Sequence, residues 1–473
     1  MKKTGLLLLA AIILAGCNSQ AKNQETSSRL PDLKISENGR YFMTADGEPF
    51  FWLGDTPWLL LKNINREDAE IYLENRRERG FNVLQIMTLH TLDIENAYGV
   101  KALIDKDVTR PNVTEGNDPA DPLQYDYWDH MDYIIQLAGK KGMYAALVPI
   151  WGSNVNRGGM TQEQARVYGE WIANRYKDYP NIIWLNGGDV NGNDSMAVWK
   201  VFGETIQRTD PNHLMTFHPR GRTSSTDWFH NEPWLDFNMF QSGHRTYDQG
   251  ISNPNTGQKE YGEDNWRYMQ EDWGKSPAKP SLDGEPSYEN IPHGLSRNPE
   301  MPRWGASDVR RYAYWCVFAG GAGFTYGENS VMQMLTPGDP TANYAASLDW
   351  REAQNAEGAA QVHFLKDLML AQPSYFDRVP DQSLVAGENG ERYNYVIATR
   401  GPEFALFYTY TGRPFSVNMG KIAGNNVKAQ WYSPRDGSYV PIGEMPNREI
   451  ADFTPPGKTA DGNDWVLVLH SVK

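Results

Sequence analysis

The chain has 473 residues, more than one ordinary domain needs, although a β/α barrel alone can take about 250 or more. Its formal net charge of −14 repels nucleic acid and anionic membrane surfaces, so we expect neither of them as a partner. The sequence contains 16 Trp and 25 Tyr residues. Many of these must pack in a core, but aromatic rings also offer faces on which sugar rings stack.

The N-terminus differs from the rest of the chain. Two lysines precede an apolar run, residues 6–15, that is too short to span a bilayer as a permanent helix. This order is typical of a secretory signal. The run ends in LAGC, which resembles the bacterial lipoprotein cleavage box, with Cys17 as the lipidated first residue. We therefore expect a lipoprotein signal peptide over 1–17, a polar tether over 18–30, and an exported, membrane-anchored protein; a plain signal peptide with an incidental Cys is the alternative.

From residue 41 onward, strand-like and helix-like segments alternate. The expected strands are residues 50–54, 81–87, 143–150, 181–186, 213–218, 235–241, 280–284 and 322–326. The expected helices are residues 66–79, 127–141, 161–179, 195–208, 266–273, 307–319 and 356–371. Only the gap between the fifth and sixth strands lacks a clear helix.

This alternation predicts an α/β fold, a (β/α)8 TIM barrel over residues 31–373. An open doubly wound sheet is the alternative. The barrel is favoured because polar and aromatic residues cluster after nearly every strand, and in a barrel all these strand ends converge on one face.

After residue 373 the helical period disappears. Short strand-like segments remain, at residues 393–399, 404–410, 427–432 and 465–470, with Gly, Pro and Asn between them. This pattern predicts a C-terminal antiparallel β-sandwich domain over residues 374–473. Residues 34–44 fit a strand either of this domain or of the barrel floor.

The cysteines leave no internal disulfide once the signal is processed, because only Cys316 remains after Cys17. Cys316 lies in the apolar run 312–319, so we expect a buried core residue. The sequence has no CxxC and no HExxH motif. We therefore expect neither a metal nor another cofactor.

Two acidic residues stand at strand ends in positions suited to chemistry. The stretch KPSLDGEPSYEN, residues 279–290, presents Glu285 where a strand gives way to a loop, and NIIWLNGGDV, residues 181–190, presents Asp189 after two glycines. Cleaving a glycosidic bond with retention needs a carboxylate nucleophile and a carboxylic acid about 5 Å apart. The ends of strands four and seven lie across one barrel mouth, so Asp189 fits the acid/base and Glu285 the nucleophile. The alternative is structural: Asp189 caps the next helix and Glu285 belongs to an ion pair.

These motifs carry a family resemblance. WLGDTPW (residues 52–58), NIIWLNGGDV and DGEPSYE resemble the apiosidase-like family, glycoside hydrolase family 140. The tail, with AQWYSPRDG (residues 429–437), resembles a domain named for collagen binding that follows this barrel in many bacterial proteins. The resemblance implies that Asp189 is the acid/base and Glu285 the nucleophile. The wider superfamily uses Glu after Asn at the strand-four position, whereas this chain has the shorter Asp after Gly.

The resemblance also implies a substrate class. It predicts a retaining glycoside hydrolase that cleaves an apiose-containing linkage in rhamnogalacturonan II, a plant cell-wall pectin. One alternative is a related retaining exo-glycosidase that acts on another sugar. A second is a non-catalytic surface carbohydrate-binding protein, which the presence of both carboxylates disfavours. We do not expect collagen binding.

Other strand-end residues are candidates for substrate binding. They are Asp55, Trp58, His90, Trp151, His218, Gln241, His244, Tyr326 and Glu328. Several have a structural alternative: His218 fits a hydrogen-bonded core histidine, Trp58 packing under a loop, and Asp55 a cap of the turn before Pro57. Glu328 also competes with Glu285 for the nucleophile role.

Overall fold

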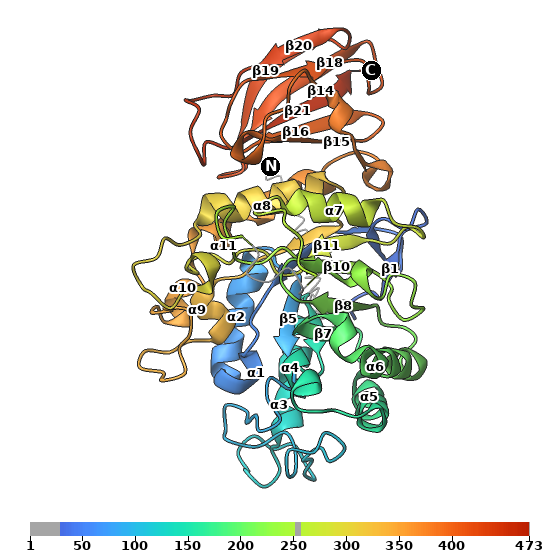
Figure 1. Ribbon diagram of the computed structural model, residues 1–473, viewed down its shortest axis with the longest axis vertical. Helices are drawn as coiled ribbons and strands as arrows, with labels where there is room; N and C mark the ends of the chain where they lie inside the picture. The colour runs from blue at the N-terminus through green and yellow to red at the C-terminus, as the bar shows by residue number, and fades with distance from the viewer. Residues whose placement is uncertain (1–28, 251–256, 473) are drawn as a thin grey trace, which may run out of the picture.

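The computed structural model describes residues 29–250 and 257–472. The expected signal peptide with Cys17, and the tether up to residue 28, lie outside the described residues. Figure 1 shows two parts, a mixed α/β body and a smaller all-β domain stacked on one end of it. In the described part of the chain, no helix is both long and apolar enough to cross a membrane.

The larger part is a nearly closed barrel. Its nine-stranded sheet has the order β8 (Met215–Pro219), β7 (Ile182–Val190), β6 (Tyr144–Val148), β5 (Val83–Met87), β4 (Trp52–Asp55), β12 (Gly323–Thr325), β11 (Ser281–Asp283), β10 (Asn238–Gln241), β9 (Thr223–Ser224). All neighbours pair in parallel except β9, which pairs antiparallel with β10. No ladder joins β8 to β10, but Asp236 N donates to Met215 O at 2.8 Å and Thr216 Oγ1 donates to Phe237 O at 2.6 Å, which closes the ring. The predicted barrel is confirmed.

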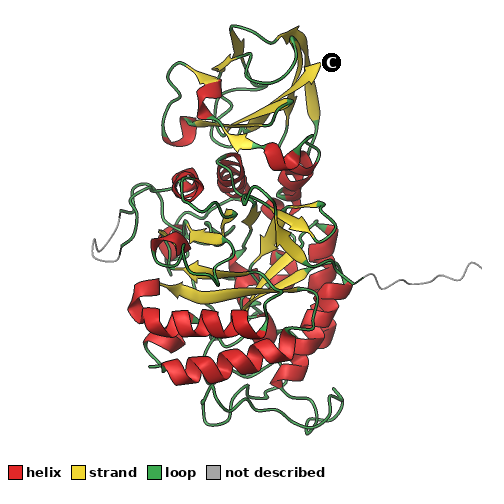
Figure 2. Ribbon diagram, turned by 90° about the vertical axis from the view of Figure 1, so that its right-hand side faces the viewer, coloured by secondary structure: helices red, strands yellow, loops and turns green. Residues whose placement is uncertain are grey.

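Helices surround these strands, as Figure 2 shows. The longer ones are α2 (Arg66–Glu78), α3 (Tyr127–Lys140), α5 (Gln162–Tyr176), α6 (Met196–Thr209), α7 (Asn265–Trp273), α8 (Ala306–Phe318) and α12 (His363–Leu370). Short helices lie in the connections: α1 (Leu60–Asn63), α4 (Gly152–Asn156), α9 (Asn329–Gln333), α10 (Trp350–Ala353) and α11 (Glu357–Gln361). The helix expected over 356–371 is thus divided at Val362 into α11 and α12. Between β8 and β10 lie the short strand β9 and a single 3-10 turn, residues 225–227, with no α-helix.

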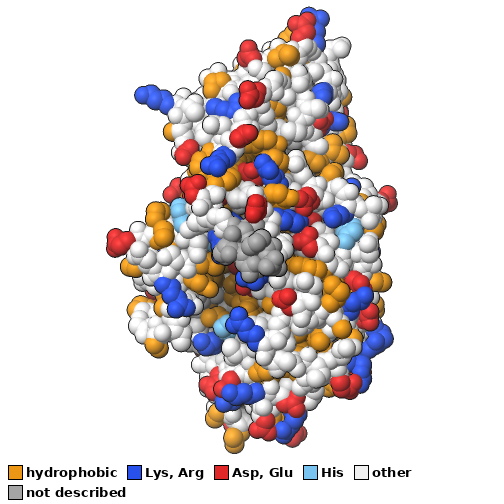
Figure 3. All heavy atoms as spheres, viewed as in Figure 1, with side chains coloured by type: hydrophobic (Ala, Val, Ile, Leu, Met, Phe, Trp, Pro, Cys, Tyr) orange, Lys and Arg blue, Asp and Glu red, His pale blue; other side chains and the backbone are white. Residues whose placement is uncertain are grey.

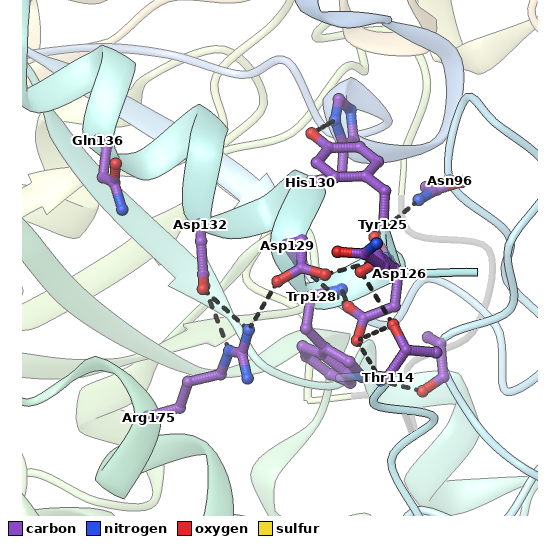
Figure 4. Close-up of polar contacts among 12 residues, drawn as sticks. Asn96, Thr114, Tyr125, Asp126, Trp128, Asp129, His130, Asp132, Gln136 and Arg175 are labelled. Atoms are coloured by element: carbon purple, nitrogen blue, oxygen red, sulfur yellow. Dashed lines mark hydrogen bonds and ion pairs between the residues drawn. The ribbon is translucent and has the colours of Figure 1, made fainter. Parts of the chain in front are cut away.

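A capping box fixes the start of α3 and the long loop before it (Figure 4). The Asp126 carboxylate accepts hydrogen bonds from Trp128 N at 2.7 Å, Asp129 N at 2.9 Å and Thr114 N at 2.7 Å. Asp129 returns the bond by accepting from Asp126 N at 3.0 Å. Two orphan N–H groups of the helix are satisfied in this way, and the loop 88–126 is tied to the barrel wall.

A small antiparallel sheet closes the bottom of the barrel. It consists of β1 (Leu33–Ile35), β2 (Phe42–Thr44) and β3 (Pro49–Phe50). Phe42 packs edge-on against Phe237, with ring centroids 5.1 Å apart, and Phe50 packs on Tyr144 at the start of β6. Residues 34–44 therefore belong to the barrel floor. Cys316 of α8 is fully buried.

The C-terminal domain is a sandwich of two antiparallel sheets. The larger has the order β13 (Val379–Pro380), β15 (Val396–Arg400), β16 (Phe404–Thr409), β21 (Trp465–Val472), β18 (Asn426–Tyr432), β19 (Tyr439–Pro446). The smaller contains β14 (Val385–Ala386), β17 (Phe415–Asn418) and β20 (Ile450–Phe453). The four strands predicted from sequence all lie in the larger sheet. The smaller sheet was not predicted, because its strands are only two to four residues long and partly exposed.

Buried arginines of α8 join the two domains. Arg310 makes a two-pronged contact with Asp464, with N–O distances of 2.9 and 3.0 Å, and Arg435 Nη1 lies 2.9 Å from the same carboxylate. Arg311 Nη2 lies 2.7 Å from Glu263 Oε2, and Tyr393 of the β domain also donates to Glu263. In Figure 1, α8 lies between the barrel and the β domain. We call this set of contacts the α8 seam; it joins the two domains through buried ion pairs.

Candidate active site

A cavity of about 270 Å³ lies where the carboxyl ends of the barrel strands converge. The lining residues are Trp58, Leu59, Lys62, Met87, His90, Trp151, Asp189, Gln241, His244, Glu285, Ile291, Leu295, Met332, Gln333, Thr341, Asn343 and Tyr344. The cavity thus holds both carboxylates singled out in the sequence, together with aromatic, amide and imidazole groups. Over the face drawn in Figure 3, acidic and basic side chains are interspersed.

The backbone before Asp189 explains why two glycines precede it. Gly187, Gly188 and Asp189 all have positive φ, at 93°, 107° and 51°, and the pairing of β7 with β8 shifts register after Gly187. A Cβ on Gly187 would lie 2.6 Å from His218 O, and one on Gly188 would lie 2.6 Å from a ring carbon of Trp151. The glycines therefore permit a bulge that turns Asp189 out of the buried strand, where it is the one exposed residue of β7.

Asp189 does not cap a helix. Helix α6 begins at Met196, and its N-cap residue is Ser195. Its position therefore excludes a helix-capping role for Asp189. The energetic cost of left-handed backbone at this aspartate needs another explanation. Strained backbone of this kind clusters at functional sites.

Glu285 follows β11 and is fixed by the strand next to it. The Glu285 carbonyl accepts a hydrogen bond from Gly243 N at 3.1 Å, and the Gly284 carbonyl accepts one from Gln85 Nε2 at 2.7 Å. A Cβ on Gly284 would lie 2.4 Å from Met239 Sδ, so only glycine fits before Glu285. The Glu285 side chain is 11% exposed, toward the cavity.

Two histidines face the Glu285 carboxylate, one at each oxygen. His244 Nε2 lies 3.0 Å from Oε1, and His218 Nε2 lies 3.3 Å from Oε2, the latter without the alignment of a full hydrogen bond. Burial raises the pKa of Glu285, but the contacts with His218 and His244 outweigh it and lower the pKa to about 2. Glu285 is therefore a carboxylate at any working pH.

The pKa of Asp189 is shifted in the opposite direction. Enclosure by protein and then the negative charge of Glu285 raise the pKa of Asp189 to about 6. Because its side chain still contacts cavity solvent, the desolvation becomes complete only when a ligand fills the cavity. Two carboxyl groups whose environments push their pKa values apart are the signature of an acid and an anion working together.

Five of the expected binding residues line the cavity: Trp58, His90, Trp151, Gln241 and His244. The Trp58 indole N–H donates to Tyr288 Oη at 2.8 Å, and the Trp58 and Trp151 rings lie 5.5 Å apart. These two rings give the cavity an aromatic wall. Burial lowers the pKa of His90, so it is neutral in the cavity.

The other four expected residues lie behind the cavity wall. His218 is fully buried and reaches Glu285 but not the cavity. Asp55 accepts from Tyr72 Oη at 2.6 Å and pairs with Arg76, because α2 packs over the end of β4. Tyr326 donates to Glu289 Oε2 at 2.6 Å. Glu328 caps α9 by accepting from Ser330 N and Val331 N at 2.7 and 2.8 Å, which places it away from the nucleophile position.

Sequence reasoning missed one side of the cavity, which the loop after β12 supplies. Gln333 holds this loop by accepting from Asn343 N at 2.7 Å and donating to Asn343 O at 3.2 Å. Tyr344, with φ at 51°, then projects near both carboxylates; its pKa is raised by burial and by the charges of Asp189 and Glu285. A long polar loop after the last strand was the available signal, since barrel enzymes build their sites from such loops.

Over residues 29–250 and 257–472, no group of three or more His, Cys, Asp or Glu side chains is arranged to hold a metal ion.

Two family models match the chain. Residues 36–376 match the model described as "Apiosidase-like, catalytic domain", and residues 379–470 match "Putative collagen-binding domain of a collagenase". None of the curated proteins matches the chain.

The solved structures that resemble the chain agree with the match to the family model. A structure described as a glycoside hydrolase shares 48% identity at a TM-score of 0.87, over 93% of this chain and 97% of that chain. A glycoside hydrolase family 5 protein from Bacteroides vulgatus ATCC 8482 shares 44% identity at a TM-score of 0.87, over 93% and 94%. A further protein from the same organism shares the fold at 17% identity and a TM-score of 0.64, over 94% and 83%.

Proposed function

Since this chain belongs to the apiosidase-like family of glycoside hydrolases, we propose that it releases apiose from pectin side chains by a retaining mechanism. Glu285 is the nucleophile and Asp189 the acid/base in this proposal. The observation that carries it is the pair of carboxyl groups in one cavity, with the pKa of Glu285 lowered and that of Asp189 raised.

In the first half-reaction, Glu285 attacks the anomeric carbon of the sugar. The bond from that carbon to the leaving-group oxygen breaks, its electron pair goes to the oxygen, and the Asp189 proton is transferred there. Cleavage yields a covalent glycosyl-enzyme and the released alcohol. The shorter reach of Asp, compared with the Glu usual at this strand end, is offset by the bulge that lifts residue 189 into the cavity.

In the second half-reaction, the roles reverse. Once Glu285 is esterified its charge is gone, so Asp189 ionises more easily and accepts a proton from water. The water oxygen bonds to the anomeric carbon, and Glu285 leaves with the electron pair. Retention of configuration follows from the two displacements.

The size and lining of the cavity support a small sugar. At about 270 Å³ it lies slightly below the usual range of about 300–1,000 Å³ for ligand sites. Its wall of two indoles offers faces for a ring, and its amides and imidazoles offer hydrogen bonds to hydroxyl groups. A branched five-carbon sugar at a chain branch fits such a cavity better than a long polysaccharide backbone does.

The substrate is tested with defined rhamnogalacturonan II side-chain oligosaccharides. We expect apiose as the released sugar, identified by chromatography, and a first product that keeps the anomeric configuration of the substrate by proton NMR. Release of another sugar alone would support the related exo-glycosidase. An inverted first product would exclude the retaining mechanism.

We further propose that the protein is anchored outside the cytoplasm by a lipid on Cys17, because residues 14–17 read LAGC after an apolar run. Cys17→Ala should move the protein from the membrane fraction to the soluble or unprocessed pool, as followed by fractionation and immunoblotting. A Cys17→Ala protein that stays firmly in the membrane fraction would indicate an uncleaved apolar anchor.

A further inference from the structure

His218 connects the two catalytic candidates without reaching the cavity. It is fully buried at the end of β8, and its ring packs against the rings of both Trp58 and Trp151, with centroids 5.4 and 5.9 Å away. Asp189 N donates to His218 Nδ1 at 3.4 Å, and His218 Nε2 lies 3.3 Å from Glu285 Oε2. His218 cannot touch a substrate, so any effect it has on the reaction passes through these neighbours.

The bulge in β7 creates this arrangement. Gly187 pairs in register with His218, and the positive φ angles that follow swing the peptide N–H of Asp189 over the imidazole. That N–H is a donor, so Nδ1 must be the acceptor and the ring proton must sit on Nε2. The proton of His218 therefore lies on the ring nitrogen nearest Glu285, 3.3 Å from Oε2, although the alignment falls short of a hydrogen bond.

His244 repeats the pattern from the other side. Tyr288 N donates to His244 Nδ1 at 3.4 Å, and His244 Nε2 lies 3.0 Å from Glu285 Oε1. Two imidazoles, each of which accepts a backbone N–H at Nδ1, thus place their Nε2 atoms beside the two carboxylate oxygens. Oε2 is closed off from solvent, so Oε1 is the oxygen that faces the cavity.

We propose that His218 is a positioning residue which, with His244, makes Glu285 a good leaving group in the second half-reaction. This inference rests on the proposed retaining mechanism and specifies which half of it the histidines serve. Donors on a carboxylate stabilise the free anion more than the ester, so they oppose the attack by Glu285 and favour its departure.

His218 acts on the step in which Glu285 leaves the glycosyl-enzyme. When the bond between the anomeric carbon and Oε1 breaks, the electron pair spreads over Oε1 and Oε2, and the water proton goes to Asp189. His218 meets the share of charge on Oε2, which no other group contacts within hydrogen-bond distance in the described part of the chain. Without that N–H, breakdown of the glycosyl-enzyme slows, whereas its formation does not.

Stopped-flow kinetics with a dinitrophenyl apioside test this inference, because that substrate needs no proton from Asp189 to form the glycosyl-enzyme. His218→Phe keeps the aromatic packing but removes the donor. We expect a burst of one dinitrophenolate per enzyme, a steady-state rate lower by about 10- to 100-fold, and a glycosyl adduct visible in the intact-protein mass. The wild type should show a smaller adduct population under the same conditions.

Two companion variants keep the test decisive. His218→Gln places an amide N–H near the position of Nε2 and should recover much of the steady-state rate and remove most of the adduct. His130→Phe changes another fully buried histidine, which contacts Ile64 O and Tyr125 far from the cavity, and should show no burst change. If His218→Phe does not fold, as judged by circular dichroism, His218→Asn serves instead, because its shorter amide stops short of Glu285.

The inference fails if folded His218→Phe slows turnover without an accumulated adduct, or if His218→Gln is as impaired as His218→Phe. Failure of the retaining mechanism itself looks different. In that case Glu285→Gln would still turn over the dinitrophenyl apioside, and neither the wild type nor any variant would carry a glycosyl adduct.

Discussion

The cavity and the α8 seam both bury charged side chains, but they pair them with different groups. In the seam, Arg310 and Arg311 pair with Asp464 and Glu263. In the cavity, the partners of Glu285 among residues 29–250 and 257–472 are imidazoles. A guanidinium never gives up its proton in a protein, whereas an imidazole is neutral near pH 7 unless its environment favours the charge.

The partner therefore differs between carboxylates that hold the fold together and the carboxylate proposed to react. A permanent cation beside Glu285 would hold it as a paired anion and make bond formation to a sugar costly. Imidazole N–H donors stabilise the anion more moderately, which suits the nucleophile role proposed for Glu285. The carboxylates of the α8 seam form no covalent bond, so they can pair with a guanidinium, the stronger partner.

The largest expected effect comes from removing the anion. Glu285→Gln keeps the side-chain shape but cannot attack, so kcat on the natural oligosaccharide should fall by several orders of magnitude while the circular dichroism spectrum is unchanged. Glu328→Gln is the matched control, because Glu328 caps α9 and should lose little activity. Near-normal turnover by Glu285→Gln would place the nucleophile elsewhere.

Removing the acid should be selective. Asp189→Ala should lower kcat/KM on a sugar leaving group by about 10²- to 10⁴-fold, because that oxygen must be protonated as it leaves. On a dinitrophenyl glycoside the loss of kcat/KM should be far smaller, and azide should restore the second step by replacing the water that needs a base. A folded variant equally inactive on both substrates, with no azide effect, would remove Asp189 from this role.

The pH dependence follows from the two shifted pKa values. Asp189 must be protonated to act as the acid, so kcat/KM on the oligosaccharide should fall about tenfold per pH unit above the pKa of Asp189, about 6. Glu285 must be ionised, so the acid limb lies near its pKa of about 2. With the dinitrophenyl glycoside the limb above pH 6 should disappear, and its persistence there would assign it to another group.

Substitutions in the α8 seam should change the stability of the protein and not its reaction rate. Arg310→Met leaves the buried Asp464 with Arg435 and a hydrogen bond from Tyr408, so we expect a loss of about 3–5 kcal/mol in the free energy of unfolding, measured by denaturant titration. The value of kcat should change little. Arg77→Met, in an exposed pair with Glu74, is the control and should leave the free energy of unfolding nearly unchanged. Equal losses for both variants would mean that the seam contributes no more than a surface ion pair.

The sequence predicted the fold because its signals are local. The alternation of apolar runs with capped helices sets the barrel, and Asp189 and Glu285 stand at strand ends where any barrel mouth would gather them. The structure also explains what was missed. Asp55, Tyr326 and Glu328 stand at strand ends too, but helices α2, α9 and α11 cover them, and only tertiary packing decides that.

The wall formed by Tyr344 depends on a loop whose conformation is set by Gln333, a contact that no spacing in the sequence reveals. The position of His218 likewise depends on the bulge. The GG before Asp189 indicates a turn, but not which ring the turned peptide will face.

The left-handed backbone at Asp189 has a consequence for the durability of the protein. A non-glycine residue with φ at 51° after two positive-φ glycines holds strain of about 1–3 kcal/mol, which the fold carries at all times and the reaction uses only in passing. Asp189→Gly should therefore unfold at a higher temperature than the active protein while releasing no natural product. The acid/base role proposed for Asp189 would then come at the expense of thermal stability, as is common where a functional site holds strained backbone.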